Sequence, residues 1–281
     1  MKRVWRGESG TILPRLIATD LDGTLLRSDG SLSTRTAAAL RLAARAGIPV
    51  VPATARPLRW LADYPLLRAA YRVVFANGAV VYDPRGGAVV ARHLLTPPAL
   101  AGLVRQIVAA VPVAVFAVEP GDGRLHRHQP TYPVRSDLRQ LGVAPAELPE
   151  LVAEPAIKLL VKAPGMATAE LLARVVAAAG RSAEASVSAL DGPVELAAPG
   201  VTKATGLAAV AAELGVPPAG VVAFGDMPND LPMLAWAGYA VAVGNAHPDV
   251  LAVADEVVGS NDQDGVASWI EARCALGQAT A

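Results

Sequence analysis

Two aspartates stand two residues apart directly after a short apolar run, in the segment Asp20-Leu21-Asp22-Gly23-Thr24. Gly23 allows the chain to turn sharply there, so both carboxylates can point into one pocket. Carboxylates that lie so close repel each other unless a cation comes between them, and hard divalent ions such as Mg²⁺ take oxygen ligands. The pair can also supply a nucleophile and a general acid or base. The segment therefore predicts an acidic, metal-binding catalytic site.

A second acidic segment lies some two hundred residues later, at Gly225–Asp230. Asp226 follows another apolar run, and Asn229 and Asp230 stand at the amino end of a predicted helix. An aspartate in that place can serve as a helix cap, or it can join the first pair around one metal ion. One divalent cation does not neutralise all of these carboxylates, so the site keeps a negative charge. An anionic substrate therefore needs hydrogen-bond donors of its own.

Such donors follow other apolar runs. Thr54 ends one run and Arg56 comes two residues later, while Asn77 ends the next. Lys203 lies in the first turn of a predicted helix, at Gly200-Val201-Thr202-Lys203. A lysine is disfavoured at the positive end of a helix, so it is either a tolerated surface charge or, together with the helix amides, part of a phosphate site. We expect the second, because the aspartates lie at the same edge.

Short runs rich in Val, Ile and Ala, each ending in a polar residue, must position these side chains. The runs are Pro14–Thr19, Ile48–Ala53, Arg72–Ala76, Val221–Gly225 and Tyr239–Gly244. Their lack of alternation predicts strands buried on both faces, and the helical patterns between them predict a parallel sheet covered on both sides. In such a sheet the ligand lies beyond the carboxyl ends of the strands.

The middle of the chain has a different pattern. Within residues 84–189, predicted strands and helices follow a turn signal at Asp83-Pro84-Arg85-Gly86-Gly87. We expect a Rossmann-like α/β core, with a parallel sheet, formed by residues 1–83 and 190–281, and an inserted α+β module at 84–189. Insertion at a loop on the ligand side of a sheet is tolerated because such loops are exposed.

Composition narrows the classes of protein. The 281 residues are 53% hydrophobic and 18% charged with a net charge of zero, which excludes a disordered chain and gives no sign of nucleic-acid or membrane binding. The single cysteine, Cys274, cannot form an internal disulfide, and no targeting segment is visible, so a cytoplasmic location is expected. The histidines lack zinc-like spacing; His126 and His128 either pack within the inserted module or face the leaving group of a substrate.

These motifs resemble those of the haloacid dehalogenase superfamily of phosphatases, within it the Cof-type, sugar-phosphatase-like branch. The resemblance covers almost the whole chain. It is carried by Asp20-Leu21-Asp22-Gly23-Thr24-Leu25, Ala53-Thr54-Ala55-Arg56, Lys203 with its preceding residues, Gly225–Asp230, and the branch-like segments at 77–79, 243–246 and 260–266. The inserted module stands where this branch carries its large α/β cap.

The resemblance implies a role for each matching residue. Asp20 would be the nucleophile that forms an aspartyl-phosphate, and Asp22 would protonate the leaving oxygen and then activate water. Mg²⁺ would be held by Asp20, the backbone carbonyl of Asp22, and Asp226, and Asp230 would contact the ion through a water molecule or through another ligand. The expected phosphate- and substrate-binding residues are Thr54, Arg56, Asn77, Lys203 and Asn229.

The expected function is Mg²⁺-dependent hydrolysis of a small phosphate monoester, with a sugar phosphate as the expected class, by a monomer or homodimer. A phosphosugar mutase and a catalytically idle phospho-ligand-binding protein remain as alternatives. Ala55 stands where the resemblance expects glycine, and its methyl group would crowd the loop or forbid a positive φ.

Overall fold

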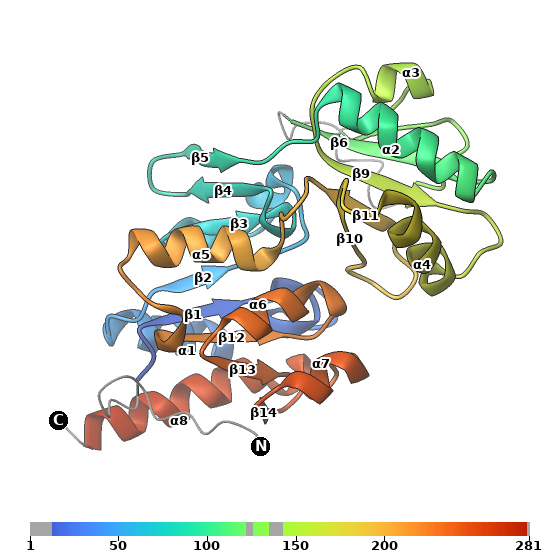
Figure 1. Cartoon of the computed structure of the whole chain (residues 1–281). Helices are drawn as coiled ribbons and strands as arrows, with labels where there is room; N and C mark the ends of the chain where they lie inside the picture. Colours follow the sequence, from blue (N-terminus) through green and yellow to red (C-terminus); the bar gives the residue numbers. More distant parts are fainter. Residues whose placement is uncertain (1–12, 122–125, 135–142, 280–281) are drawn as a thin grey trace.

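A parallel sheet with strand order β14-β13-β12-β1-β2 forms the centre of the core (Figure 1). The computed structural model describes residues 13–121, 126–134 and 143–279. The strands are β1 (Leu16–Thr19), β2 (Val50–Pro52), β12 (Val221–Gly225), β13 (Tyr239–Ala242) and β14 (Glu256–Val257), all paired in parallel. β1, β12 and β13 are buried along their whole length, as their continuous apolar sequence predicts. The predicted α/β class with a Rossmann-like core is confirmed.

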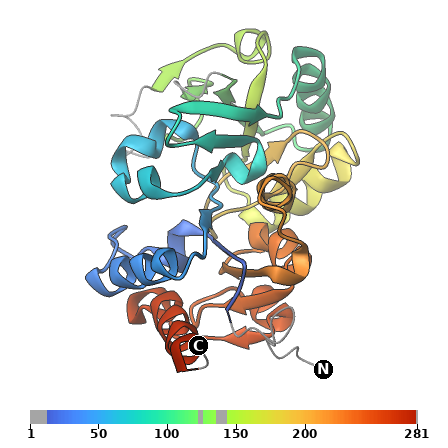
Figure 2. The same cartoon turned by 90° about the vertical axis from the view of Figure 1, so that its left-hand side faces the viewer.

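Helices cover both faces of this sheet. α1 (Thr34–Arg45) packs against α8 (Gly265–Ala279), and α5 (Lys203–Glu213) packs against α6 (Leu231–Trp236). Figure 2 shows the first pair on one side of the sheet and the second pair on the other. The shorter α7 (Pro248–Val253) lies between β13 and β14 in the chain. Ser33 and Thr202 cap α1 and α5 with their hydroxyl oxygens, as their sequence positions predict.

A small antiparallel sheet extends the core at its β2 edge. It consists of β3 (Val73–Phe75), β4 (Val80–Asp83) and β5 (Ala88–Arg92). A parallel bridge between Ala53 and Val74 joins it to the end of β2. This bridge aligns the polar residues that follow β2 and β3.

The inserted unit is a six-stranded sheet with order β10-β11-β9-β6-β7-β8. Its strands are β6 (Val115–Pro120), β7 (His126–His128), β8 (Val143–Pro145), β9 (Ala156–Lys162), β10 (Glu184–Ser186) and β11 (Val194–Ala197). α2 (Pro97–Ala110) and α4 (Thr168–Ala179) pack against each other and on this sheet, and α3 (Leu148–Leu151) is a single turn. The predicted α+β insertion is therefore present, and we refer to it as the cap.

The two crossings between core and cap fall near the predicted boundaries. β5 is paired with β4, and β11 is paired with β9 and β10 of the cap sheet. The strand pairing places β5 with the core and β11 with the cap sheet, while the division into 1–83 with 190–281 and 84–189 remains a prediction.

Several short turns complete the described chain. 3₁₀ turns occur at Leu58–Asp63, Pro65–Ala69, Ala76–Gly78, Pro218–Gly220, Pro228–Asp230 and Asn261–Gln263, and a wider helical turn at Leu21–Leu25. Within the described residues, none of the helices combines the length and the apolar character that crossing a bilayer requires.

Candidate active site

Adjacent strands β1 and β12 bring the two acidic segments together. The backbone N–H of Asp20 donates to the carbonyl of Phe224 at 3.0 Å, so β1 and β12 end side by side at the same edge of the sheet. Asp20 and Asp226 follow these strand ends and are only 5% and 6% exposed. The predicted convergence of carboxylates beyond the carboxyl edge of the sheet is what the topology produces.

Lys203 links two of these carboxylates. Its Nζ donates to Asp20 Oδ1 at 2.6 Å and to Asp230 Oδ1 at 2.7 Å, and its side chain is fully buried. The Thr202 cap begins α5 one residue earlier, which sends this first-turn lysine toward the end of β1. Burial alone would lower the pKa of Lys203, but the charges of Asp20 and Asp230 outweigh it and raise that pKa. Lys203 therefore stays cationic beside Asp20.

Three carboxylates form a group suited to a metal ion. Asp20, Asp226 and Asp230 each offer an oxygen, and these oxygens lie within 4.8 Å of one another. Burial, followed by the charge of Asp230, raises the pKa of Asp226 to about 6, although Thr24 Oγ1 donates to it at 2.7 Å. Burial also raises the pKa of Asp20 well above its ordinary value, against the opposing effect of Lys203. Buried, mutually repelling oxygen ligands fit a hard divalent cation, which would relieve both effects.

Asp230 also shapes the loop after β12. Its Oδ2 accepts hydrogen bonds from the backbone N–H groups of Asp226 at 3.0 Å and Met227 at 3.1 Å. A side chain on Gly225 would meet Asp230, since an added Cβ would lie 2.6 Å from the Cβ of that residue. Asp230 is therefore both a candidate ligand and the residue that fixes the direction of Asp226.

Gly23 lets the first acidic loop approach the second. Its φ is +76°, and an added Cβ would lie 2.4 Å from Asp226 Oδ2. Both the left-handed backbone and the contact with Asp226 require glycine here.

The Gly23→Ala variant is expected to lose at least about 100-fold in kcat/KM, because Asp226 must move away from the added methyl group. The measurement is phosphate release from an ester that the wild type hydrolyses. Gly47→Ala is the matched control, since Gly47 has φ +73° but nothing within 4 Å of the added Cβ. Equal losses in the two variants would attribute the effect to backbone strain rather than to displacement of Asp226.

Asp22 is not one of the three grouped carboxylates, and its side chain pairs with Arg56. Arg56 Nε donates to Asp22 Oδ2 at 2.6 Å, and a second guanidinium nitrogen donates to Oδ1. The Arg56 guanidinium also lies 4.4 Å from the ring centre of Trp60 and 4.6 Å from that of Tyr64. The side chain of Asp22 is 46% exposed, so it is accessible from solvent. The roles of Asp22 in metal binding and Arg56 in substrate binding remain predictions.

The remaining predicted binding residues come from the loops after β2 and β3 and from the turn before α6. Thr54 is fully buried, and its hydroxyl accepts from the backbone N–H of Arg56 at 3.0 Å. Asn77 Oδ1 accepts from Asn229 Nδ2 at 3.1 Å. Asn77 has φ +55° and the preceding Ala76 has φ +52°, a strained conformation for non-glycine residues. That strain directs the Asn77 side chain toward the cap, which sequence patterns could not reveal.

The backbone at residue 55 does not require the glycine that the resemblance predicts there. In the described chain the non-glycine residues with positive φ are Ala76, Asn77 and Asp264, so Ala55 has an ordinary backbone. Its carbonyl instead accepts a hydrogen bond from Lys158 Nζ of the cap at 2.8 Å.

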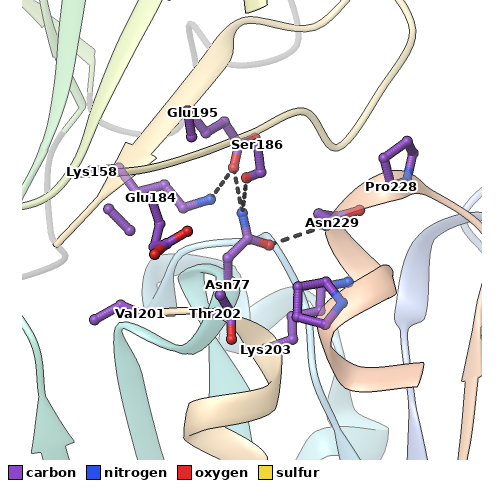
Figure 3. Close-up of a pocket in the computed structure, with 13 residues that line it drawn as sticks. Asn77, Lys158, Glu184, Ser186, Glu195, Val201, Thr202, Lys203, Pro228 and Asn229 are labelled. Carbon is purple, nitrogen blue, oxygen red and sulfur yellow. Dashed lines mark hydrogen bonds and ion pairs between the residues drawn. The ribbon is translucent and has the colours of Figure 1, made fainter. Parts of the chain in front are cut away.

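A small pocket lies between the loops of the core and the cap (Figure 3). Its volume is about 90 Å³, and its lining includes Asn77, Lys203 and Asn229 from the core and Lys158 and Glu195 from the cap. Figure 3 shows Asn77 pointing up toward Glu195, to which its Nδ2 donates at 2.8 Å. Sequence reasoning missed the two cap residues. The available signal was a charged residue in the interior of each of two largely apolar strands, Lys158 in β9 and Glu195 in β11, since buried charges of this kind need partners.

Comparison with known proteins identifies the family. Residues 17–270 match the family described as haloacid dehalogenase-like hydrolase. The chain belongs to this family. This confirms the resemblance drawn from the motifs, and the chain is a phosphatase of the haloacid dehalogenase type.

Similar proteins match over nearly their full lengths. The 5-amino-6-(5-phospho-D-ribitylamino)uracil phosphatase YitU of Bacillus subtilis (strain 168) is 29% identical over 92% of this chain and 97% of its own. The HMP-PP phosphatase of Cronobacter sakazakii is 30% identical over 92% of this chain and 95% of its own. The solved structure of SMU.1108c from Streptococcus mutans UA159 has a TM-score of 0.82 at 23% identity, over 93% and 99% of the two chains, which establishes the shared fold.

Proposed function

We propose that this haloacid dehalogenase-like hydrolase cleaves a small phosphate monoester, of the sugar-phosphate kind, through an aspartyl-phosphate on Asp20 and with Mg²⁺ as its metal ion. The observation that carries the proposal is the buried contact of Lys203 with Asp20 at 2.6 Å, beside the carboxylates of Asp226 and Asp230. This arrangement supplies a carboxyl nucleophile, a fixed cation beside it and ligands for a second cation, and the two positive charges together would favour the ionised form of Asp20 against its burial. Phosphoryl transfer needs these more than elaborate covalent chemistry.

Each residue would act on a definite atom. Asp20 attacks phosphorus in line, the bond from phosphorus to the ester oxygen breaks, and Asp22 gives that oxygen a proton. Asp22 then takes a proton from the water that attacks phosphorus, and phosphate leaves with Asp20 regenerated. Lys203 neutralises charge on the phosphoryl oxygens throughout. Mg²⁺, when held by Asp20, Asp226 and Asp230, would add a second neutralising charge there.

The substrate class rests on the polarity of the pocket and on the relatives. The pocket offers polar groups beyond Lys203, among them Asn77, Ser186 and Glu195, beside apolar residues such as Val201 and Pro232. YitU of Bacillus subtilis is named for a substrate whose phosphate is part of a phospho-D-ribitylamino group. A hydroxylated leaving group would find hydrogen-bond partners among these polar groups.

Screening a panel of phosphate esters for inorganic phosphate, with Mg²⁺ and with EDTA, tests the proposal. Release of phosphate from one or more small polar esters, lost in EDTA, is the expected result. Conversion of a sugar phosphate into its isomer without free phosphate would establish the mutase alternative instead. Failure to release phosphate from any ester in the panel would contradict the proposed function.

Metal removal should change stability in a pH-dependent way. The folded-state pKa of Asp226 is raised to about 6 from an ordinary 3.8. Burying the ionised carboxylate therefore lowers the free energy of unfolding at pH values where Asp226 is ionised in both the folded and the unfolded state. Without metal, stability from this group is fully present below the ordinary pKa and is lost as pH rises through about 6. We therefore expect Mg²⁺ to raise the Tm by several degrees at pH 7.5 and much less at pH 5. An equal Mg²⁺ effect at both pH values would contradict the assignment of Asp226 as a ligand.

A further inference from the structure

One face of the cap sheet lies against the core. In β6, Phe116 and Val118 pack into the hydrophobic core of the cap with α2 and α4, whereas Ala117 belongs to a separate cluster. Successive side chains of a strand point to opposite faces, so Glu119 shares the face of Ala117. Glu119 is bound by Arg59 of the core. The face that carries Glu119 is therefore the one turned toward the catalytic loops.

On this face a buried carboxylate joins the core to a histidine of the cap. Glu119 accepts hydrogen bonds from two guanidinium nitrogens of Arg59, one of them at 2.9 Å, and lies 3.0 Å from His126 Nδ1. The side chains of Arg59, Glu119 and His126 are 9%, 6% and 3% exposed. Burial alone would raise the pKa of Glu119, but these hydrogen bonds outweigh it and lower that pKa, so the carboxylate stays ionised.

The ionised carboxylate fixes the imidazole. A carboxylate can only accept, so Nδ1 of His126 carries a hydrogen, and Nε2 is a hydrogen-bond acceptor when the ring carries that one hydrogen. Both His126 Nε2 and Arg59 Nε are buried and have no hydrogen-bond partner among the described residues. Buried polar atoms are rarely left unpaired. One free acceptor and one free donor, held on the same carboxylate, complement a hydroxyl group, which both donates and accepts.

This group belongs to the same polar face as the pocket. Glu119 stands opposite Lys158 in the β6–β9 register, and Lys158 lines the pocket and pairs with Glu195. Tyr132 packs with Ala117 on this face, and burial, followed by the charges of Glu195 and Glu119, raises its pKa. The register therefore places Glu119, with Arg59 and His126, beside the pocket-lining Lys158 on one face of the cap sheet.

We propose that His126 is a specificity-determining residue, whose Nε2 accepts a hydrogen bond from a hydroxyl of the leaving group while Arg59 Nε donates to the oxygen of that same hydroxyl. This inference rests on the proposed function, because it assigns the leaving-group side of the same site. Arg59 comes from the core and Glu119 from the cap, so the recognition group is complete only when the cap lies against the core. The substrate class that follows is a phosphate ester of a polyol or sugar.

The test couples a change in the protein to a change in the ligand. Calorimetry in the Asp20→Asn background, with Mg²⁺, measures binding of glucose 6-phosphate, ribose 5-phosphate and monodeoxy analogues of each. We expect at least one deoxy analogue to bind about tenfold or more weakly than its parent, because its absent hydroxyl leaves His126 and Arg59 unpaired. With His126→Leu added, the parent and that analogue should bind within about twofold of each other.

Controls separate recognition from structure. His93 is exposed and lies outside the polar face, so His93→Leu in the same background should preserve the tenfold gap. His126→Gln retains an acceptor and should preserve part of it. The inference is overturned if His126→Leu weakens all ligands equally, which would mean a packing histidine paired with water, or if no deoxy analogue loses affinity, or if no ester binds at all. Phosphate release by the wild type is judged separately, so a selective but inactive protein would contradict the proposed function alone.

Discussion

Replacing Asp20 with asparagine is expected to reduce phosphate release by at least about 10³-fold, since the amide is no nucleophile toward phosphorus. The side chain keeps its size and one oxygen that can accept from Lys203, so the fold should persist. Steady-state kinetics on the best ester of the panel, together with circular dichroism and thermal melting, measures both effects.

Two further observations make the Asp20 prediction specific. Asp249→Asn is a suitable control, because that carboxylate is 68% exposed and lies in the first turn of α7. Mass spectrometry of the wild type, quenched in acid during turnover, should find the phosphoryl group on the peptide that contains Asp20. Retention of more than a tenth of the activity by Asp20→Asn, or phosphate trapped on another residue, would contradict the mechanism.

Replacing Lys203 with methionine should damage both activity and stability. The variant removes the cation that lies between Asp20 and Asp230 and leaves buried carboxylates without compensation. We expect kcat to fall by about 10³-fold or more, because a charge aimed at the phosphoryl group is lost. We also expect a lower Tm that Mg²⁺ raises by more than it does in the wild type, because the ion becomes the remaining source of positive charge.

Lys162→Met serves as the control for Lys203. Its ammonium donates to the carbonyl of Asp191 at an exposed site, and no acidic side chain depends on it in the described structure. This variant should keep wild-type kcat and the wild-type response to Mg²⁺. A Lys203→Met variant with normal kcat, or one whose Tm Mg²⁺ raises no more than in the wild type, would remove Lys203 from the site.

The catalytic side of the site could be predicted because its residues follow strand ends. Once β1 and β12 are recognised as buried parallel strands, Asp20 and Asp226 must meet, and a helix beginning at Thr202 brings Lys203 to the same edge. β12 and α4 occupy the residues expected from the sequence, Val221–Gly225 and Thr168–Ala179. Local pattern and topology together decide these positions.

The cap side of the site could not be predicted, because its contacts depend on which strands become neighbours. β7 contains the residues His-Arg-His and has no apolar signal, yet it pairs with β6 and places His126 on Glu119. The contacts Arg59–Glu119 and Asn77–Glu195 span 60 and 118 residues of chain and join two domains. Positive φ at Ala76 gave no signal either, since it is not a glycine.

The loop after β2 has a consequence for protein engineering. Its carbonyl at Ala55 is bound by Lys158, and four residues later Arg59 binds Glu119, so a short stretch of the core is matched to the cap. A chimera that received the cap of a relative would present new side chains to this stretch and lose both contacts. Exchange of specificity between family members should therefore succeed when residues 54–59 are transplanted together with the cap, and fail when the cap is grafted alone.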